Sequence, residues 1–147
     1  MSETMTLTTK DRFLGHFENL DFSHDVDFSL AKRDEAREIL ADLEFPTSKT
    51  EYWKYTRINK LIKGDYNISY PENEIELDLA VPSKNCIVLV NGYFSEELSF
   101  MECTEGIRFS SLSAAKKNDA ILEEKFATLS KKDEIFSLIN TAHHQDG

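Results

Sequence analysis

The stretch ENEIELDLAV, residues 72–81, constrains the fold more than any other, because its side chains alternate strictly between acidic and apolar. This period of two predicts a half-buried strand whose acidic side faces water. The acidic row could bind a hard cation, but neighbouring side chains on a strand face lie about 7 Å apart, too far for a calcium cage. A solvated face is therefore predicted for the four carboxylates, Glu72, Glu74, Glu76 and Asp78.

Two further short strands are predicted after this one. Residues 86–90, CIVLV, form an unbroken apolar run rich in β-branched side chains, which favours a buried strand. Asn91 and Gly92 then form a turn signal, followed by YFSEELSF. A third short strand is predicted at GIRFS, around Ile107 and Phe109.

Helical patterns precede the strands. A first helix is predicted within residues 6–20 and a second within residues 30–45, where Arg33 and Arg37 fall on a different face from the apolar residues. Pro46 ends the second helix. The residues that mark the two helices are Phe13, Leu14, Phe17 and Leu20, with Thr8 or Thr9 as N-cap, and then Ala36, Ile39, Leu40 and Leu43.

Helical patterns also follow the strands. Ser110 or Ser111 is the predicted cap of a helix beginning SLSAAKKN, DAILEEKFATL continues the helical spacing, and Asp133 caps a last helix over DEIFSLINTAH. The order of helices, about three short strands and helices again predicts an α+β fold. A chain of 147 residues fits one domain, 1–147, with residues 1–5 disordered.

Charge and hydropathy exclude several partners. The net charge of −10 repels phosphate backbones and anionic lipid surfaces, so neither nucleic acid nor membrane is a predicted partner. The sequence has no apolar run long enough to span a bilayer and no secretory signal at its start, so a cytoplasmic location is expected.

Catalytic motifs are absent from the sequence. It contains no glycine-rich phosphate loop, no H-E-x-x-H and no G-x-S-x-G, so no enzyme activity, cofactor site or metal site is predicted. Cys86 and Cys103 are interpreted as reduced cysteines. The adjacent His143 and His144 are predicted to be exposed or terminal, since neighbours on a helix point about 100° apart. His16 and His24 are interpreted as structural or solvated.

The segment EYWKYT combines three rings with charged residues, and Ser48 and Glu51 have the spacing of a capping box for a short helix. Trp and Tyr supply rigid contact area with a polar handle, which suits both core edges and docking surfaces. Two readings therefore stay open, one in which Trp53 anchors its own core and one in which it contacts another domain or subunit. The candidate structural or partner-contact residues are Glu51, Trp53, Lys54, Tyr55 and Thr56.

Four segments in sequence order resemble the N-terminal part of the SufD family. They are FPTSKTEYWKYTRINKL, IVLVNGYFSEELS, GIRFSSLSAAKK and DEIFSLINTAHHQDG. The resemblance implies a non-catalytic scaffold that joins SufB-like and SufC-like subunits in iron–sulfur cluster assembly, the cluster being handled by the full complex. It also implies that the family's parallel β-helix follows residue 147 and does not lie within this chain. No cluster-related residue is carried over.

The resemblance leaves two rival hypotheses. The chain could be an unrelated small protein-interaction domain, or it could bind a cluster itself. Two cysteines are too few for a cluster that usually takes four, so no stable cluster is expected. A β-helix has open ends that need covering, so an exposed apolar patch is predicted near the strands or the last helix.

Overall fold

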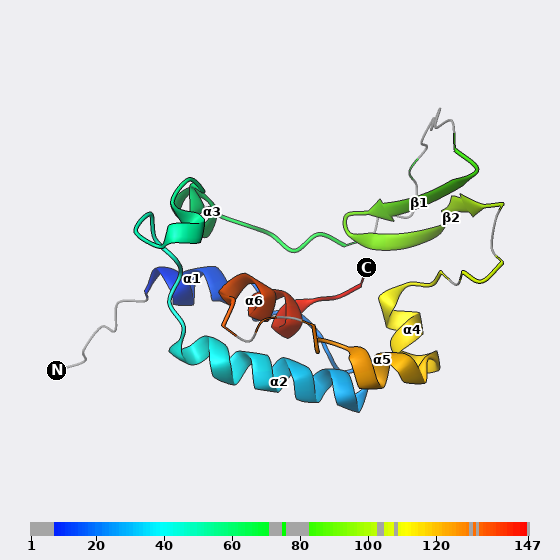
Figure 1. The fold of residues 1–147 in the computed structure, drawn as a ribbon, viewed down its shortest axis with the longest axis horizontal. Coiled ribbons are helices and arrows are strands. Elements are labelled where there is room, and N and C mark those ends of the chain that lie inside the picture. Colours follow the sequence, from blue (N-terminus) through cyan, green and yellow to red (C-terminus); the bar gives the residue numbers. More distant parts are fainter. Residues whose placement is uncertain are drawn as a thin grey trace.

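The computed structural model describes residues 8–70, 75, 83–102, 105–107, 109–129, 131 and 133–146. Within this part of the chain, helices flank one antiparallel hairpin, so the fold is α+β as the sequence predicts (Figure 1). The elements are α1 Thr9–Gly15, α2 Asp27–Asp42, the 3-10 helix η1 Glu51–Trp53, α3 Ile58–Ile62, β1 Asn85–Val90, β2 Tyr93–Met101, α4 Leu112–Asn118, α5 Ala120–Lys125 and α6 Ile135–His143.

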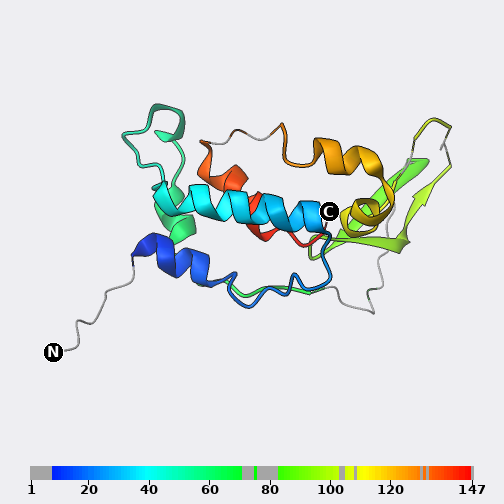
Figure 2. The same cartoon turned by 90° about the horizontal axis from the view of Figure 1, so that it is seen from below.

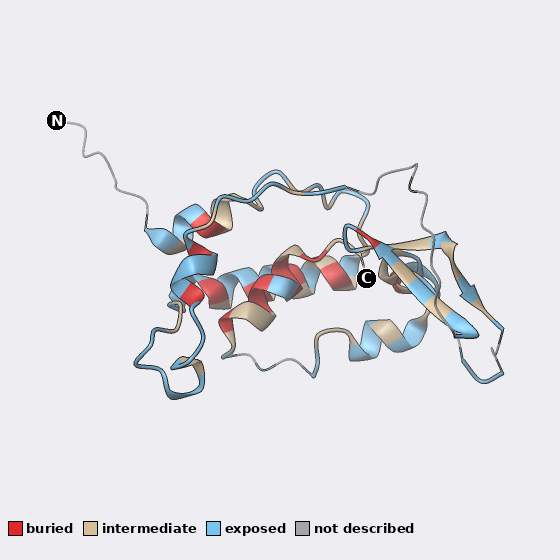
Figure 3. Cartoon of the chain, turned by 90° about the horizontal axis from the view of Figure 1, so that it is seen from above, coloured by how far each residue is buried: buried red, intermediate tan, exposed pale blue. Residues whose placement is uncertain are grey.

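Helix α2 is the longest element, and α6 packs along it (Figures 1 and 2). At one end of this pair lie α1 and α3, and at the other lie α4, α5 and the β1–β2 hairpin. Buried residues concentrate on α2, α6 and the α1–α3 end, whereas the hairpin is mostly exposed or half-buried (Figure 3). The hydrophobic core therefore lies between helices and not on the sheet.

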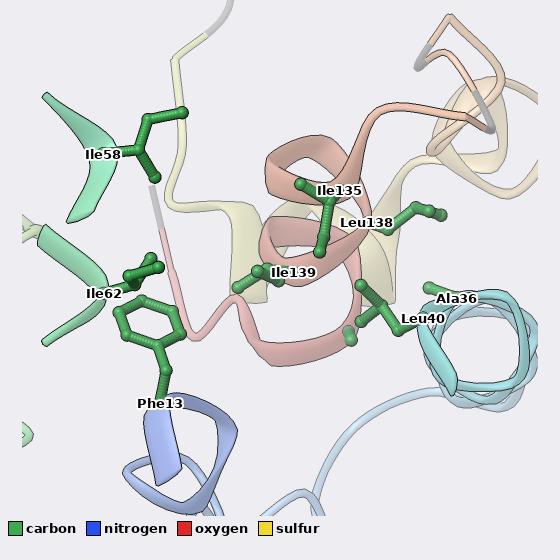
Figure 4. Close-up of a cluster of buried hydrophobic side chains, with 9 residues drawn as sticks. Phe13, Ala36, Leu40, Ile58, Ile62, Ile135, Leu138 and Ile139 are labelled. Carbon is green, nitrogen blue, oxygen red and sulfur yellow. The ribbon is translucent and has the colours of Figure 1, made fainter. Parts of the chain in front are cut away.

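The core is one cluster that joins four helices. Phe13 of α1 and Ile58 and Ile62 of α3 meet the α6 side chains, which in turn pack on α2 (Figure 4). Helix α6 buries five of its nine residues, Ile135, Leu138, Ile139, Thr141 and Ala142, and this explains its central place. The buried apolar members are Phe13, Ala36, Leu40, Ile58, Ile62, Ile135, Leu138, Ile139 and Ala142.

Helix ends are fastened by local and long-range hydrogen bonds. Thr8 and Asp11 form a capping box at the start of α1, which confirms one of the two predicted N-caps. The Lys10 ammonium donates to three carbonyl oxygens at the end of α2, those of Leu40 (3.1 Å), Ala41 (2.8 Å) and Leu43 (2.9 Å). A cation at a helix C-terminus satisfies unpaired carbonyls and opposes the helix dipole, so Lys10 ties α1 to α2.

The sheet differs from the predicted one. The 86–90 strand is present as β1, and YFSEELSF pairs with it as β2 in an antiparallel register that is irregular between Cys86 and Val88. Ile107 and Phe109 are not in a strand, so the prediction at GIRFS is wrong. The predicted 72–81 strand, apart from Ile75, lies outside the described residues.

Three local predictions also need correction. Ser48 forms no capping box with Glu51, because η1 is preceded by Thr50 and has no side-chain cap. Asp133 does not cap α6, which begins after Glu134, again without a side-chain cap. Arg33 is buried on the core side of α2, only 1% exposed, and not on a separate face. By contrast, Ser111 caps α4 as predicted.

The hairpin turn gives a direct test of backbone strain. Asn91 and Gly92 have φ values of 51° and 89°, the left-handed backbone that a tight two-residue turn requires. A methyl group at Gly92 would meet no atom, so Gly92→Ala is expected to lower the free energy of unfolding by about 1–2 kcal/mol through backbone strain alone. Urea denaturation followed by circular dichroism measures this change.

The matched control for the turn is Gly15→Ala. Gly15 is helical and has room for a methyl group, so this substitution is expected to stabilise the protein by about 0.5–1 kcal/mol. Equal effects at Gly92 and Gly15 would contradict the strain argument.

Candidate functional site

A buried ionic cluster joins helices α2, α4 and α6. Asp25 precedes α2, Arg33 lies on α2, Lys116 lies on α4 and His144 follows α6. The Asp25 carboxylate accepts hydrogen bonds from Arg33 Nε (2.8 Å) and Lys116 Nζ (2.6 Å). The three charged side chains are 7%, 2% and 4% exposed, so these ion pairs are withdrawn from solvent. The Ser29 hydroxyl also donates to Asp25, at 2.8 Å.

Arg33 uses its remaining donors on the end of α6. Its Nη1 donates to the carbonyl of Ala142 (3.1 Å) and its Nη2 to the carbonyl of His144 (2.7 Å). The guanidinium carbon lies 4.0 Å from the centroid of the Phe22 ring, a cation–π contact. Arg33 therefore satisfies the last carbonyls of α6, which have no partner within that helix.

His144 completes the cluster as a neutral imidazole. Its Nδ1 lies 3.0 Å from the carbonyl of Thr141, whereas its Nε2 faces Arg33 Nη2 (3.0 Å) and Lys116 Nζ (3.2 Å). A ring nitrogen between two cations must accept, so the proton belongs on Nδ1. Burial, followed by the charge of Arg33, lowers the pKa of His144 to about 4.

The pKa of Asp25 is lowered, although burial alone would raise it. Burial raises the pKa of this carboxyl group, but hydrogen bonds from Lys116, Ser29 and Arg33 outweigh burial and hold it well below its usual value. Asp25 is therefore ionised, and with neutral His144 the cluster carries two positive charges and one negative charge.

His143 is half-buried. Its ring stacks on Phe17 with centroids 4.6 Å apart, and burial, followed by Arg37 and Arg33, lowers its pKa to about 4. Its Nδ1 is buried and has no hydrogen-bond partner among the described residues. The two histidines lie at the end of α6, but His143 is half-buried and His144 is buried, so the exposure that the sequence analysis allowed for them is wrong.

The cluster has a structural role, because its contacts hold three helices together. Its charged groups bind one another or backbone carbonyls, and they connect the start of α2, the middle of α4 and the end of α6. Sequence reasoning missed it, although a signal existed: Ser29 and Arg33 continue the helical stripe of Ala36 and Leu40. Among the residues that the structure describes, no group of three His, Cys, Asp or Glu side chains is placed to hold a metal ion.

The predicted EYWKYT residues lie at the opposite end of the molecule, beside α3. Trp53 is half-buried, and its ring lies 5.1 Å from that of Phe136 on α6, so it packs against the edge of the core. The other four, Glu51, Lys54, Tyr55 and Thr56, are exposed. Only Trp53 thus has the position of an anchor, and its neighbours remain available at the surface.

The remaining cysteines and histidines lie apart from the cluster centre. Cys86 is a free, half-buried cysteine of β1, and Cys103 is outside the described residues. His16 packs edge-on against Phe13, and exposed His24 borders a cavity of about 160 Å³ beside the cluster. Within the described ranges, no helix has the length and apolar character needed to cross a membrane.

The fold and the cluster together define a small helical α+β module with a two-stranded hairpin at one end. The chain belongs to the family described as SufBD protein N-terminal region, which matches residues 11–147. This match confirms the resemblance at the level of SufB and SufD proteins together, a family of iron–sulfur cluster assembly. Comparisons with curated proteins and with solved structures found no match.

Proposed function

We propose that this chain is the N-terminal module of a SufD-type scaffold subunit that acts without catalysis in a cytoplasmic SufBCD-type complex. The observation that carries this proposal is the family match, which runs from residue 11 to the last residue. The four resembling segments contribute to the elements η1, α3, β1, β2, α4 and α6, so they span the fold and are not confined to one motif.

The surface of the module supports a docking role. Ile87 and Leu89 alternate along one face of β1 and are 46% and 53% exposed. Ile107 and Phe109, in the segment after β2, are also about half exposed. A two-stranded hairpin is marginal in water unless it packs on something else, so this apolar end suits contact with a following β-helix or a neighbouring subunit.

The ionic cluster gives the most strongly perturbed ionisable groups of this module a structural role, which suits a scaffold. The titratable groups with the largest shifts are Asp25 and the two histidines, and Asp25 and His144 hydrogen-bond within the cluster. Perturbed groups of this kind occur in structural ion-pair networks as well as in active sites. Iron–sulfur clusters enter the proposal as cargo of the complete complex.

Affinity purification of the tagged native protein from its own cells tests the proposal. We expect a SufB-type subunit and a SufC-type ATPase to co-purify, and depletion of the protein to lower the activity of iron–sulfur enzymes. Recovery of a SufD-type partner instead would identify the chain as SufB-type. Absence of all these subunits, with unchanged iron–sulfur enzymes, would reject the scaffold function.

A further inference from the structure

The charge of this chain is unevenly distributed. Residues 49–63 contain five basic side chains and one acidic side chain, a net charge of +4. The whole chain carries −10, so the remaining residues carry −14. The basic residues of this segment are Lys49, Lys54, Arg57, Lys60 and Lys63.

These basic side chains face solvent. All five residues are exposed, and none forms an ion pair with a carboxylate of the described residues. The segment includes η1 and α3, at the end of the molecule opposite the hairpin (Figure 1). An unpaired basic patch on an acidic protein creates a local field that attracts negative charge.

Two tyrosines project from the same segment. Tyr52 is 95% exposed and Tyr55 is 90% exposed, and the Lys54 ammonium lies 5.5 Å from the centroid of the Tyr55 ring. Half-buried Trp53, between them in sequence, fixes the backbone against the core. Rigid tyrosine rings and arginine are the residue types that contribute most to binding energy at protein interfaces.

A recess lies beside these rings. Tyr52, Trp53, Phe45 and Pro46 line part of a cavity of about 490 Å³. Its lining also includes three carboxylates, Glu44, Asp133 and Glu134, and one ammonium, Lys131. Acidic groups of a ligand are therefore repelled from the recess and would instead meet the neighbouring lysines and Arg57.

We propose that this basic aromatic surface, formed by Lys49, Tyr52, Lys54, Tyr55, Arg57, Lys60 and Lys63, binds an acidic protein segment that carries one aromatic side chain. Charge complementarity selects the partner, and the tyrosines with the adjoining recess retain it. A short acidic segment meets the patch alone, whereas a nucleic acid extends beyond it and is repelled by the acidic remainder of the chain. The proposal does not depend on a role in cluster assembly.

Fluorescence anisotropy with a labelled probe tests this assignment. The probe is a short synthetic peptide of glutamates around one central phenylalanine, titrated with the purified chain at low salt and at physiological salt. We expect Tyr52→Ser with Tyr55→Ser to weaken binding by about 5-fold or more, as loss of interface hot spots does. Lys54→Gln with Arg57→Gln is expected to weaken it about 3- to 10-fold at low salt and less at physiological salt.

The matched control removes two lysines elsewhere. Lys84 and Lys125 have side chains that are 81% and 62% exposed. Lys84→Gln with Lys125→Gln therefore lowers the net charge by as much as Lys54→Gln with Arg57→Gln does, but leaves the basic aromatic surface unchanged. Binding by this variant is expected to change by less than about 2-fold. Circular dichroism checks that each variant is folded.

Five results would overturn the proposal. One is no binding of the acidic peptide at low salt, and another is an equal loss in the Lys84 and Lys125 control. Equal binding of single-stranded DNA, or of a peptide with alanine in place of phenylalanine, would show general attraction of anions. Salt-sensitive dimers that the tyrosine substitutions abolish would show that the surface binds a second copy of the chain.

Discussion

Replacing Asp25 by asparagine is expected to lower the free energy of unfolding by about 3–5 kcal/mol, because it leaves Arg33 and Lys116 buried without an anion. The substitution preserves the shape of the side chain, so the loss reports charge rather than packing. A domain of this size is typically stable by about 5–15 kcal/mol, so a large part of its stability depends on one carboxylate. Urea denaturation of both proteins at neutral pH measures the difference.

Two companion variants separate this effect from general charge loss. Asp34→Asn removes an exposed ion pair with Arg37, in which the Asp34 side chain is 70% exposed, and is expected to change stability by less than about 0.5 kcal/mol. Lys116→Met leaves one cation for one carboxylate, so it is expected to cost less than Asp25→Asn. A loss at Asp25 no larger than that at Asp34 would show that the cluster contributes little.

Acidification is expected to destabilise the protein between pH 6.5 and about 4, through His144 and His143. The pKa of each histidine is about 4 in the folded chain, against an ordinary value of 6.5. In this window the histidines are protonated in the unfolded chain but neutral in the folded chain, so the free energy of unfolding falls as pH falls. The loss is on the order of 3 kcal/mol for His144, and it ends below pH 4, where both states are protonated.

The slope of stability against pH is the informative measurement here. His144→Gln removes one titrating group, so its free energy of unfolding is expected to fall less steeply than that of the natural chain across the window. The contributions of unaltered carboxylates cancel in this comparison. An unchanged slope in His144→Gln would show that His144 does not titrate in this way.

Local patterns in the sequence predicted most helices of this fold. The stripe of Ala36 and Leu40, the caps at Thr8 and Ser111 and the Asn91–Gly92 turn all act over a few residues, and each is present in the structure. The α+β class followed from their order. The strand expected at GIRFS failed because a short apolar pattern does not determine whether a pairing partner is present.

The ionic cluster lay beyond such patterns because its partners are far apart in sequence. Asp25 and Lys116 are 91 residues apart, and Arg33 and His144 are 111 apart. An arginine on an apolar stripe indicates a buried ion pair only when its acceptor is known. The adjacent histidines gave no sign of burial, since their environment is set by the helix that receives the end of α6.

The α1–α3 end of the molecule is held by apolar packing, whereas α4 is held by ion pairs, so the two ends differ in their response to protons. Phe13, Ile58 and Ile62 hold the α1–α3 end by contacts that are indifferent to protons, whereas α4 is joined to α2 and to the end of α6 through Lys116. Mild acid should therefore loosen α4 from α2 and from the end of α6 before it affects the contacts among Phe13, Ile58 and Ile62.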